Sequence, residues 1–137
     1  MKKPKKWVIA PIAAGAAVLA GTEPVLAKIL RNTIDPTASL HANGRIAEGA
    51  ALIACTDGER VEVTVTFTQG EVTGEGHTHG KCTGELTRYR VKVKARGGAD
   101  FEPGPAEACA VAVNTDRGTV VDTREWCRED DIELVEK

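Results

Sequence analysis

Residues 61–68 read VEVTVTFT, and this stretch decides the fold class. Val61, Val63, Val65 and Phe67 alternate with polar residues, which places them together on one face of an extended chain. Strict alternation in a segment rich in β-branched residues is typical of a half-buried β-strand. The stretch therefore predicts a strand with one face in a core and the other in solvent.

Six further segments carry the same alternation, in some places more weakly. Residues 107–113, for example, set Cys109, Val111 and Val113 on one face against three alanines on the other. Turn residues such as Gly, Pro, Asn and Asp separate the segments. This spacing is typical of an all-β protein, an immunoglobulin-like antiparallel β-sandwich of seven or eight short strands. The expected strands are 50–55, 61–68, 72–79, 89–95, 107–113, 118–123 and 131–135.

The N-terminus predicts an export signal. Four lysines precede an apolar run over 7–21, and the small residue Ala27 ends the segment. This pattern is typical of a secretory signal peptide over 1–27, and no Arg-Arg pair marks the twin-arginine route. The run is shorter than the roughly 20 apolar residues of a spanning helix, although an uncleaved anchor stays an alternative. The expected organisation is a signal peptide helix (1–27), a flexible arm (28–40) that contains Pro36, and one domain (41–137).

Cleavage after Ala27 changes the charge of the chain. The full 137 residues contain 18 basic and 20 acidic side chains, a net charge of −2. Removing the first 27 residues takes away four basic residues and one acidic residue, which leaves 110 residues at −5. A net negative charge favours solubility and argues against general affinity for nucleic acid or anionic membranes. The sequence thus predicts a protein that is secreted or held in the cell envelope. We expect it to be a monomer that does not bind nucleic acid and has no membrane span after cleavage.

The four cysteines predict two disulfides. An even cysteine count behind a signal peptide is typical of an oxidising destination, and aromatic residues, at 4%, supply little core. Four cysteines allow three pairings. We favour Cys55 with Cys82 and Cys109 with Cys127, because each sequential pair would join neighbouring strands. Zinc binding is the alternative, but no CxxC spacing supports it.

Short landmarks recur in a fixed order along the domain. They are Gly49, Cys55-Thr56, Val61-x-Val63-x-Val65, Gln69-Gly70, Gly74-x-Gly76, Cys82-Thr83-Gly84, Phe101-x-Pro103-Gly104-Pro105-Ala106 and Asp122 to Trp126. In these landmarks the domain resembles an uncharacterised family of small exported β-sandwich proteins found mainly in actinobacteria. The resemblance covers residues 44–135, and the family has no assigned activity from which a catalytic residue could be carried over. In architecture alone, the domain is also similar to the neocarzinostatin-type apoproteins, which carry a small molecule.

One predicted strand face carries only cations. Arg88, Arg90, Lys92 and Lys94 alternate with apolar residues and are spaced about 6.6 Å apart along a strand. One interpretation is a solvated surface whose positive charge is balanced by neighbouring acids such as Glu62 or those at 131–133. The other is a binding face for an anionic envelope polymer. No aromatic residue interleaves with the cations, so nucleic-acid binding is not favoured.

His77 and His79 are weak candidates for a metal site, because alternate residues of a strand point the same way. His41 or Glu75 could supply a third ligand, whereas the plain alternative is a polar end of a hairpin. The acidic run 129–131 lacks the spacing of a calcium loop and predicts a solvated turn.

The sequence predicts no enzyme and no cofactor. Histidines are few, Ser39 is the one serine after Ala27, and the cysteines are expected to be oxidised. The expected function is a non-enzymatic binding or interaction module whose partner is an anionic envelope polymer or another protein. The alternative is a small-molecule carrier with a cleft between the sheets lined by Phe101, Tyr89 or Trp126, and a hydrolase or metal-binding protein comes third. Trp126 and Cys127 are adjacent, so a regular strand cannot turn both toward the core.

Overall fold

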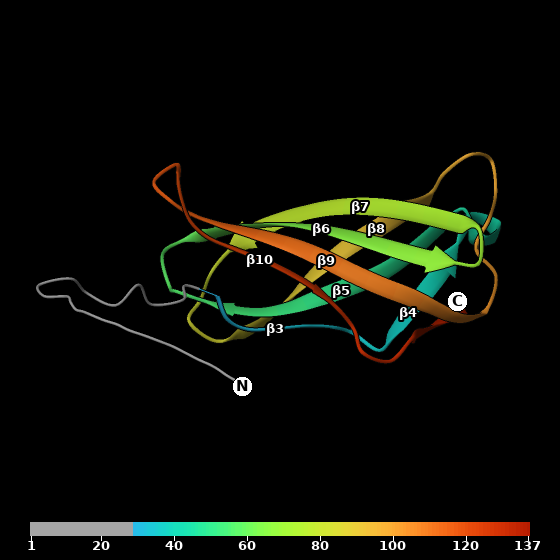
Figure 1. Cartoon of the computed structure of the whole chain (residues 1–137), viewed down its shortest axis with the longest axis horizontal. Helices are drawn as coiled ribbons and strands as arrows, with labels where there is room; N and C mark the ends of the chain where they lie inside the picture. Colours follow the sequence, from blue (N-terminus) through green and yellow to red (C-terminus); the bar gives the residue numbers. More distant parts are fainter. Residues whose placement is uncertain (1–28) are drawn as a thin grey trace, which may run out of the picture.

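A computed structural model describes residues 29–137 (Figure 1). The predicted signal peptide over 1–27, with its anchor alternative, lies outside the described residues. Within residues 29–137, no helix is long and apolar enough to cross a membrane.

The described chain is a β-protein of nine strands and one short 3-10 turn, η1 (Ala42–Gly44). Each of the seven predicted strands is present: the first five are extended at one or both ends, and the last two begin one residue later than predicted and end later. The strands are β3 (Ile29–Ile34), β4 (Thr37–His41), β5 (Ile46–Cys55), β6 (Arg60–Gln69), β7 (Val72–Lys81), β8 (Leu86–Ala95), β9 (Gly104–Asp116), β10 (Thr119–Cys127) and β11 (Ile132–Glu136).

The prediction of a flexible arm over 28–40 is wrong for the described part of that segment. Residues 29–34 form β3, which pairs with β5, and residues 37–41 form β4, which pairs with both β5 and β11. Ile29 and Ile34 are buried, as are Ala38 and Leu40. The domain therefore begins by residue 29, because burying these apolar side chains stabilises the extended segment.

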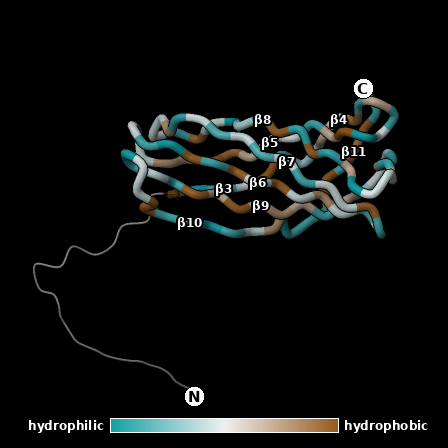
Figure 2. The backbone as a smooth tube through the Cα atoms, turned by 90° about the horizontal axis from the view of Figure 1, so that it is seen from above, coloured by the Kyte–Doolittle hydropathy of each residue, from teal (hydrophilic) through white to brown (hydrophobic). Residues whose placement is uncertain are grey.

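The strands form a sandwich whose two layers are joined by hydrogen bonds (Figures 1 and 2). One layer contains β3, β4, β5 and β8, and the other contains β6, β7, β9 and β10. The layers join where β7 pairs with β8 at Gly74 and Glu75, and where β11 lies between β4 and β9. All pairings are antiparallel except that of β4 with β11, which is parallel and departs from the predicted antiparallel arrangement. The sandwich is thus closed by backbone hydrogen bonds at one end.

Side-chain interactions hold the other end. There the buried Cys55–Cys82 disulfide joins the end of β5 to the residue after β7. Along the open edge, the Ile29 backbone N–H donates to Asp122 Oδ2 of β10 at 3.0 Å. The Asn114 amide, fully buried, donates to a carboxylate oxygen of the buried Glu59. The disulfide and the Ile29–Asp122 hydrogen bond join the two layers where strand pairing between them is absent, and the Asn114–Glu59 hydrogen bond ties β9 to the residue before β6 within one layer.

The core follows the predicted alternation, seen in Figure 2 as hydrophobic positions recurring along the strands. Val61, Val63, Val65 and Phe67 are all buried. The inward face of β9 consists of its alanines, while Val111 and Val113 point outward. Small residues bring the strands close, since a Cβ added at Gly49 would lie 2.9 Å from the Phe67 ring. The core is therefore built from small side chains at close approach more than from aromatic rings.

Both favoured disulfides are present, Cys55–Cys82 and Cys109–Cys127. Cys109 and Cys127 are direct partners in the β9–β10 register, and their bond lies on the outer face of the sheet. Trp126 packs partly buried against the core, whereas Cys127 is exposed. The strand thus turns the tryptophan inward and the cysteine outward.

Tyr89 spans the gap where β7 and β8 diverge. The two strands pair only at Gly74 and Glu75, and farther along the Tyr89 hydroxyl donates to the Lys81 carbonyl at 2.6 Å. The ring covers Gly80, where an added Cβ would lie 2.8 Å from it. Burial raises the pKa of Tyr89 above 10.0, and the Thr87 hydrogen bond acts in the opposite direction.

Replacing Tyr89 with Phe should lower the free energy of unfolding by about 1 kcal/mol at neutral pH, because one hydrogen bond is lost. The raised pKa means that the neutral phenol stabilises the fold fully below pH 10, and that this contribution is lost as the pH rises through the folded-state pKa. Urea unfolding of both proteins between about pH 8 and pH 11 should show their difference shrinking. A difference that is independent of pH would contradict this role.

The two disulfides should differ in their reactivity toward thiols. Cys55 and Cys82 are 0% and 2% exposed, whereas Cys127 is open to solvent. Graded dithiothreitol followed by alkylation and peptide mass analysis should modify Cys109 and Cys127 at least about tenfold faster, because the attacking thiolate must reach a sulfur. The Cys109→Ser/Cys127→Ser variant should still fold, with a loss of about 3 kcal/mol. Modification of all four cysteines at one rate would show that reduction requires global unfolding.

Candidate functional site

The basic strip consists of Arg88, Arg90, Lys92 and Lys94 on the outer face of β8. All four are exposed, while Tyr89, Val91 and Val93 of the same strand are buried. The alternation predicted this orientation, because neighbouring residues of a strand point to opposite faces of the sheet. The strip therefore runs along the outside of the layer that contains β5.

The acids beside the strip are not those the sequence suggested. Arg88 pairs with Asp35, in the turn between β3 and β4. In the strand register, Lys92 lies opposite Glu48 of β5 and Lys94 lies opposite Glu75 of β7. Glu62 instead lies in the other layer, opposite His79, and Glu133 lies on β11.

Three cations of the strip are open to a ligand. Within residues 29–137, no carboxylate oxygen lies within 4.0 Å of a side-chain nitrogen of Arg90, Lys92 or Lys94. Arg96, rather than Lys94, is the ion-pair partner of Glu75, and His77 Nε2 lies 3.8 Å from the same carboxylate. The strip thus presents a row of cations about 6.6 Å apart to the solvent.

A cavity of about 250 Å³ lies beside the strip, and we name it the Ala50 hollow. Its floor is Gly49 and Ala50, because β5 has only a methyl group here between the larger Glu48 and Leu52. The turn between β3 and β4 passes along one side, and Arg88 and Arg90 lie on the other. The lining residues are Asp35, Thr37, Ser39, Glu48, Gly49, Ala50, Arg88, Arg90 and Lys137.

His77 and His79 lie on the same face of β7, as the alternation predicted, but have separate neighbours. His77 Nδ1 shares a hydrogen bond of 2.9 Å with Thr64 Oγ1, and its Nε2 is 3.8 Å from Glu75. Arg60 donates to His79 Nδ1 at 3.3 Å, which places a cation against that ring. Among the described residues, no group of three His, Cys, Asp or Glu side chains could hold a metal ion.

His41, one of the two possible third ligands, lies elsewhere. It belongs to β4, which β5 and β8 separate from β7, and its Nε2 is 3.2 Å from Glu48.

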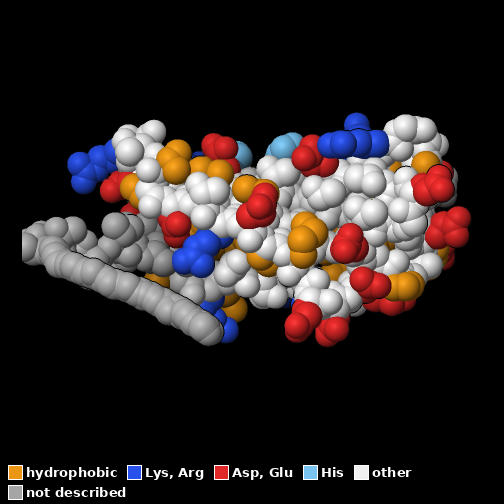
Figure 3. Space-filling model, viewed as in Figure 1, with side chains coloured by type: hydrophobic (Ala, Val, Ile, Leu, Met, Phe, Trp, Pro, Cys, Tyr) orange, Lys and Arg blue, Asp and Glu red, His pale blue; other side chains and the backbone are white. Residues whose placement is uncertain are grey.

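The acidic run 129–131 is exposed between β10 and β11. Figure 3 shows acidic side chains along the border and at one end of the face.

The aromatic residues proposed for a carrier cleft belong to the core. Phe101 is 2% exposed, and its ring meets Phe67 edge-on with centroids 6.5 Å apart. Tyr89 is buried as well. Trp126 borders an outer groove of about 540 Å³ over the Cys109–Cys127 bond, lined also by Thr64, Thr66, Ala110, Val111 and Glu125. The space between the layers is therefore filled, and the groove lies outside it.

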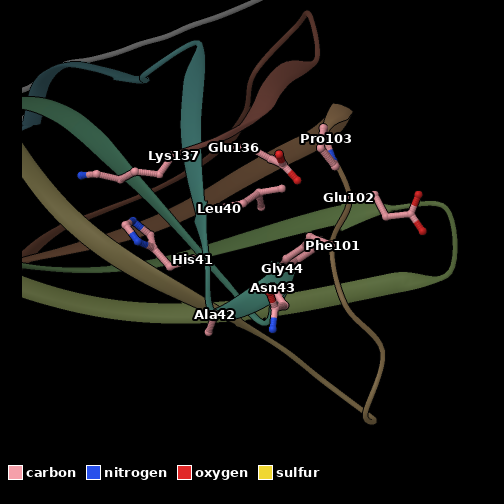
Figure 4. Close-up of a pocket in the computed structure, with 10 residues that line it drawn as sticks. All are labelled: Leu40, His41, Ala42, Asn43, Gly44, Phe101, Glu102, Pro103, Glu136 and Lys137. Atoms are coloured by element: carbon pink, nitrogen blue, oxygen red, sulfur yellow. The ribbon is translucent and has the colours of Figure 1, made fainter.

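A larger cavity, about 600 Å³, lies at the closed end beside η1 (Figure 4). Ala42 and Asn43 adopt left-handed backbone conformations there, with φ of 54° and 60°. Figure 4 shows His41 pointing to one side of this cavity and Glu102 pointing away on the other. The labelled side chains do not converge on a common point.

The chain matches no protein-family model, and no curated protein matches its sequence. The resemblance to the exported actinobacterial family therefore stays a prediction.

Proposed function

We propose that this protein is an exported, non-enzymatic binding module that holds an anionic polymer of the cell envelope along the basic strip. The observation that carries the proposal is the row formed by Arg90, Lys92 and Lys94, exposed and without an ion pair among the described residues. Long charged side chains in such a row attract a linear polyanion more strongly than an isolated charge does.

The charge distribution supports this proposal. Residues 28–137 carry a net charge of −5, yet the strip is a cluster of one sign. A cationic row on an otherwise acidic domain attracts anions locally, while the rest of the surface repels them. Such a domain would bind a polyanion in one orientation.

The two disulfides are compatible with an oxidising location outside the cytoplasm. The Cys55–Cys82 bond reinforces the end of the sandwich where backbone pairing between the layers is missing. A small domain that works outside the cell benefits from such reinforcement, because its core alone is thin.

A triple variant tests the strip. Arg90→Gln, Lys92→Gln and Lys94→Gln together should weaken binding to a soluble polyanion such as polygalacturonate by at least about tenfold at low salt, since each exposed charge contributes about 0.5–1 kcal/mol. Arg88 is kept so that Asp35 retains its partner. Isothermal titration calorimetry at several salt concentrations should also show a weaker salt dependence for the variant.

The matched control is Arg31→Gln, Arg60→Gln and Lys81→Gln. These three cations are exposed, lie off the strip and, within residues 29–137, form no ion pair, so the control changes the net charge by the same amount without leaving an acid unpaired. An equal loss of binding in both triple variants would show that net charge, and not the strip, determines binding. Unchanged binding in the strip variant would show that the strip does not bind the polyanion.

A small-molecule carrier is the second candidate function, and the groove beside Trp126 favours it. An apolar ligand in this groove would bury the Val111 side chain and change the fluorescence of Trp126. Such binding would be insensitive to salt, which distinguishes it from the polymer-binding function.

A further inference from the structure

We infer that the Ala50 hollow is a subsite for one carboxylated sugar unit, a hexuronate, of the bound polymer. This inference rests on the proposed function and narrows its ligand from any polyanion to an acidic glycan.

The size of the hollow suits one sugar unit. At about 250 Å³ it falls just below the range of about 300–1,000 Å³ found for sites that bind drug-sized molecules. The hollow adjoins the strip through Arg88 and Arg90, so a polymer lying along the strip could insert one unit without leaving the remaining cations.

Arg90 supplies the anion-binding group of the subsite. Arg88 is occupied by Asp35, whereas no carboxylate of residues 29–137 lies within 4.0 Å of the Arg90 guanidinium nitrogens. A guanidinium presents two parallel N–H donors that match the two oxygens of a carboxylate. Arg90 can therefore bind the carboxylate of a sugar acid at the mouth of the hollow.

Two carboxylates, two hydroxyl groups and one further cation, Lys137, line the rest of the hollow beside Arg88. The side chains of Asp35 and Glu48 are only 18% and 28% exposed, and both are carboxylates. A carboxylate accepts hydrogen bonds from sugar hydroxyls but repels a phosphate or sulfate group. Thr37 and Ser39 add hydroxyl groups that can donate or accept.

The mixed lining distinguishes between classes of polyanion. A hexuronate unit carries one carboxylate for Arg90 and several hydroxyls for the acceptors. Inorganic polyphosphate carries anionic oxygens and no donors along its chain, so it would pair with the cations but offer no hydrogen bond to Asp35 or Glu48. The geometry thus points to an acidic glycan over a bare phosphate polymer.

Glu48→Gln tests the inference because the two ligand classes predict opposite signs. With oligogalacturonate as the probe, the variant should bind about fivefold more weakly, since a charged acceptor makes a stronger hydrogen bond than a neutral amide. With inorganic polyphosphate, the variant should bind about twofold more tightly, because a repelling charge next to Lys92 is gone. Stronger binding of both probes would overturn the subsite.

Glu62→Gln is the matched control, because Glu62 is an exposed acid on the outer face of β6 in the other layer. It should change the affinity for both probes slightly and in the same direction. An effect of Glu62→Gln equal to that of Glu48→Gln on both probes would also overturn the subsite.

Ala50→Leu supplies a second variant, because a larger side chain would fill the floor of the hollow. The affinity of this variant for oligogalacturonate should fall until it no longer exceeds the affinity for polyphosphate. The affinity for polyphosphate should stay unchanged. Thermal unfolding and circular dichroism check that this variant folds, and Glu48→Gln decides the question if it does not.

The two levels of the proposal fail separately. If the strip variant binds neither probe while Glu48→Gln raises the affinity for both, polymer binding by the strip is supported and the subsite is wrong. If the wild-type protein binds neither probe, the proposed function fails, and the subsite fails with it.

Discussion

The antiparallel register between β5 and β8 determines where Glu48 and the four cations of the basic strip lie. The nine paired positions run from Ile46 opposite Lys94 to Ala54 opposite Leu86. A shift by one residue would turn the basic strip into the core and the valines of β8 into solvent. This register is secured because Val91 and Val93 are buried, so the cost of exposing them holds the cations outside.

Small residues make this arrangement possible, and they also explain why it needs reinforcement. A Cβ added at Gly76 would lie 2.2 Å from the Lys92 carbonyl, so glycine lets β7 approach the backbone of β8 closely. Closely packed strands built on alanine, glycine and valine bury less apolar area than strands with large side chains would. The Cys55–Cys82 bond and the Tyr89 hydrogen bond compensate at the end where the layers lack backbone pairing.

The sequence predicted the strands whose alternation is strong, the orientation of the basic strip and the disulfide pairing, because each is a local pattern or a consequence of neighbouring strands. It did not predict β3 and β4, since Pro36 interrupts the segment and β4 depends on a parallel pairing with the distant β11. The Asp35–Arg88 ion pair joins residues 53 positions apart, and no local pattern reveals it. The Ala50 hollow was missed for the same reason, because its walls come from four separate segments.

The pairing of a cationic row with half-buried acids has a physical consequence for selectivity. A purely basic groove binds every polyanion, and its affinity follows the charge of the ligand. Carboxylates inside the hollow weaken binding of ligands that bring only anions, and they accept hydrogen bonds from ligands that also bring hydroxyl groups. Specificity is a difference between affinities, and a repelling group directed at the wrong ligand contributes to it as much as an attracting one does. In the proposed subsite, Asp35 and Glu48 would therefore lower affinity for polyanions in general while raising discrimination in favour of a hydroxyl-bearing, carboxylated chain.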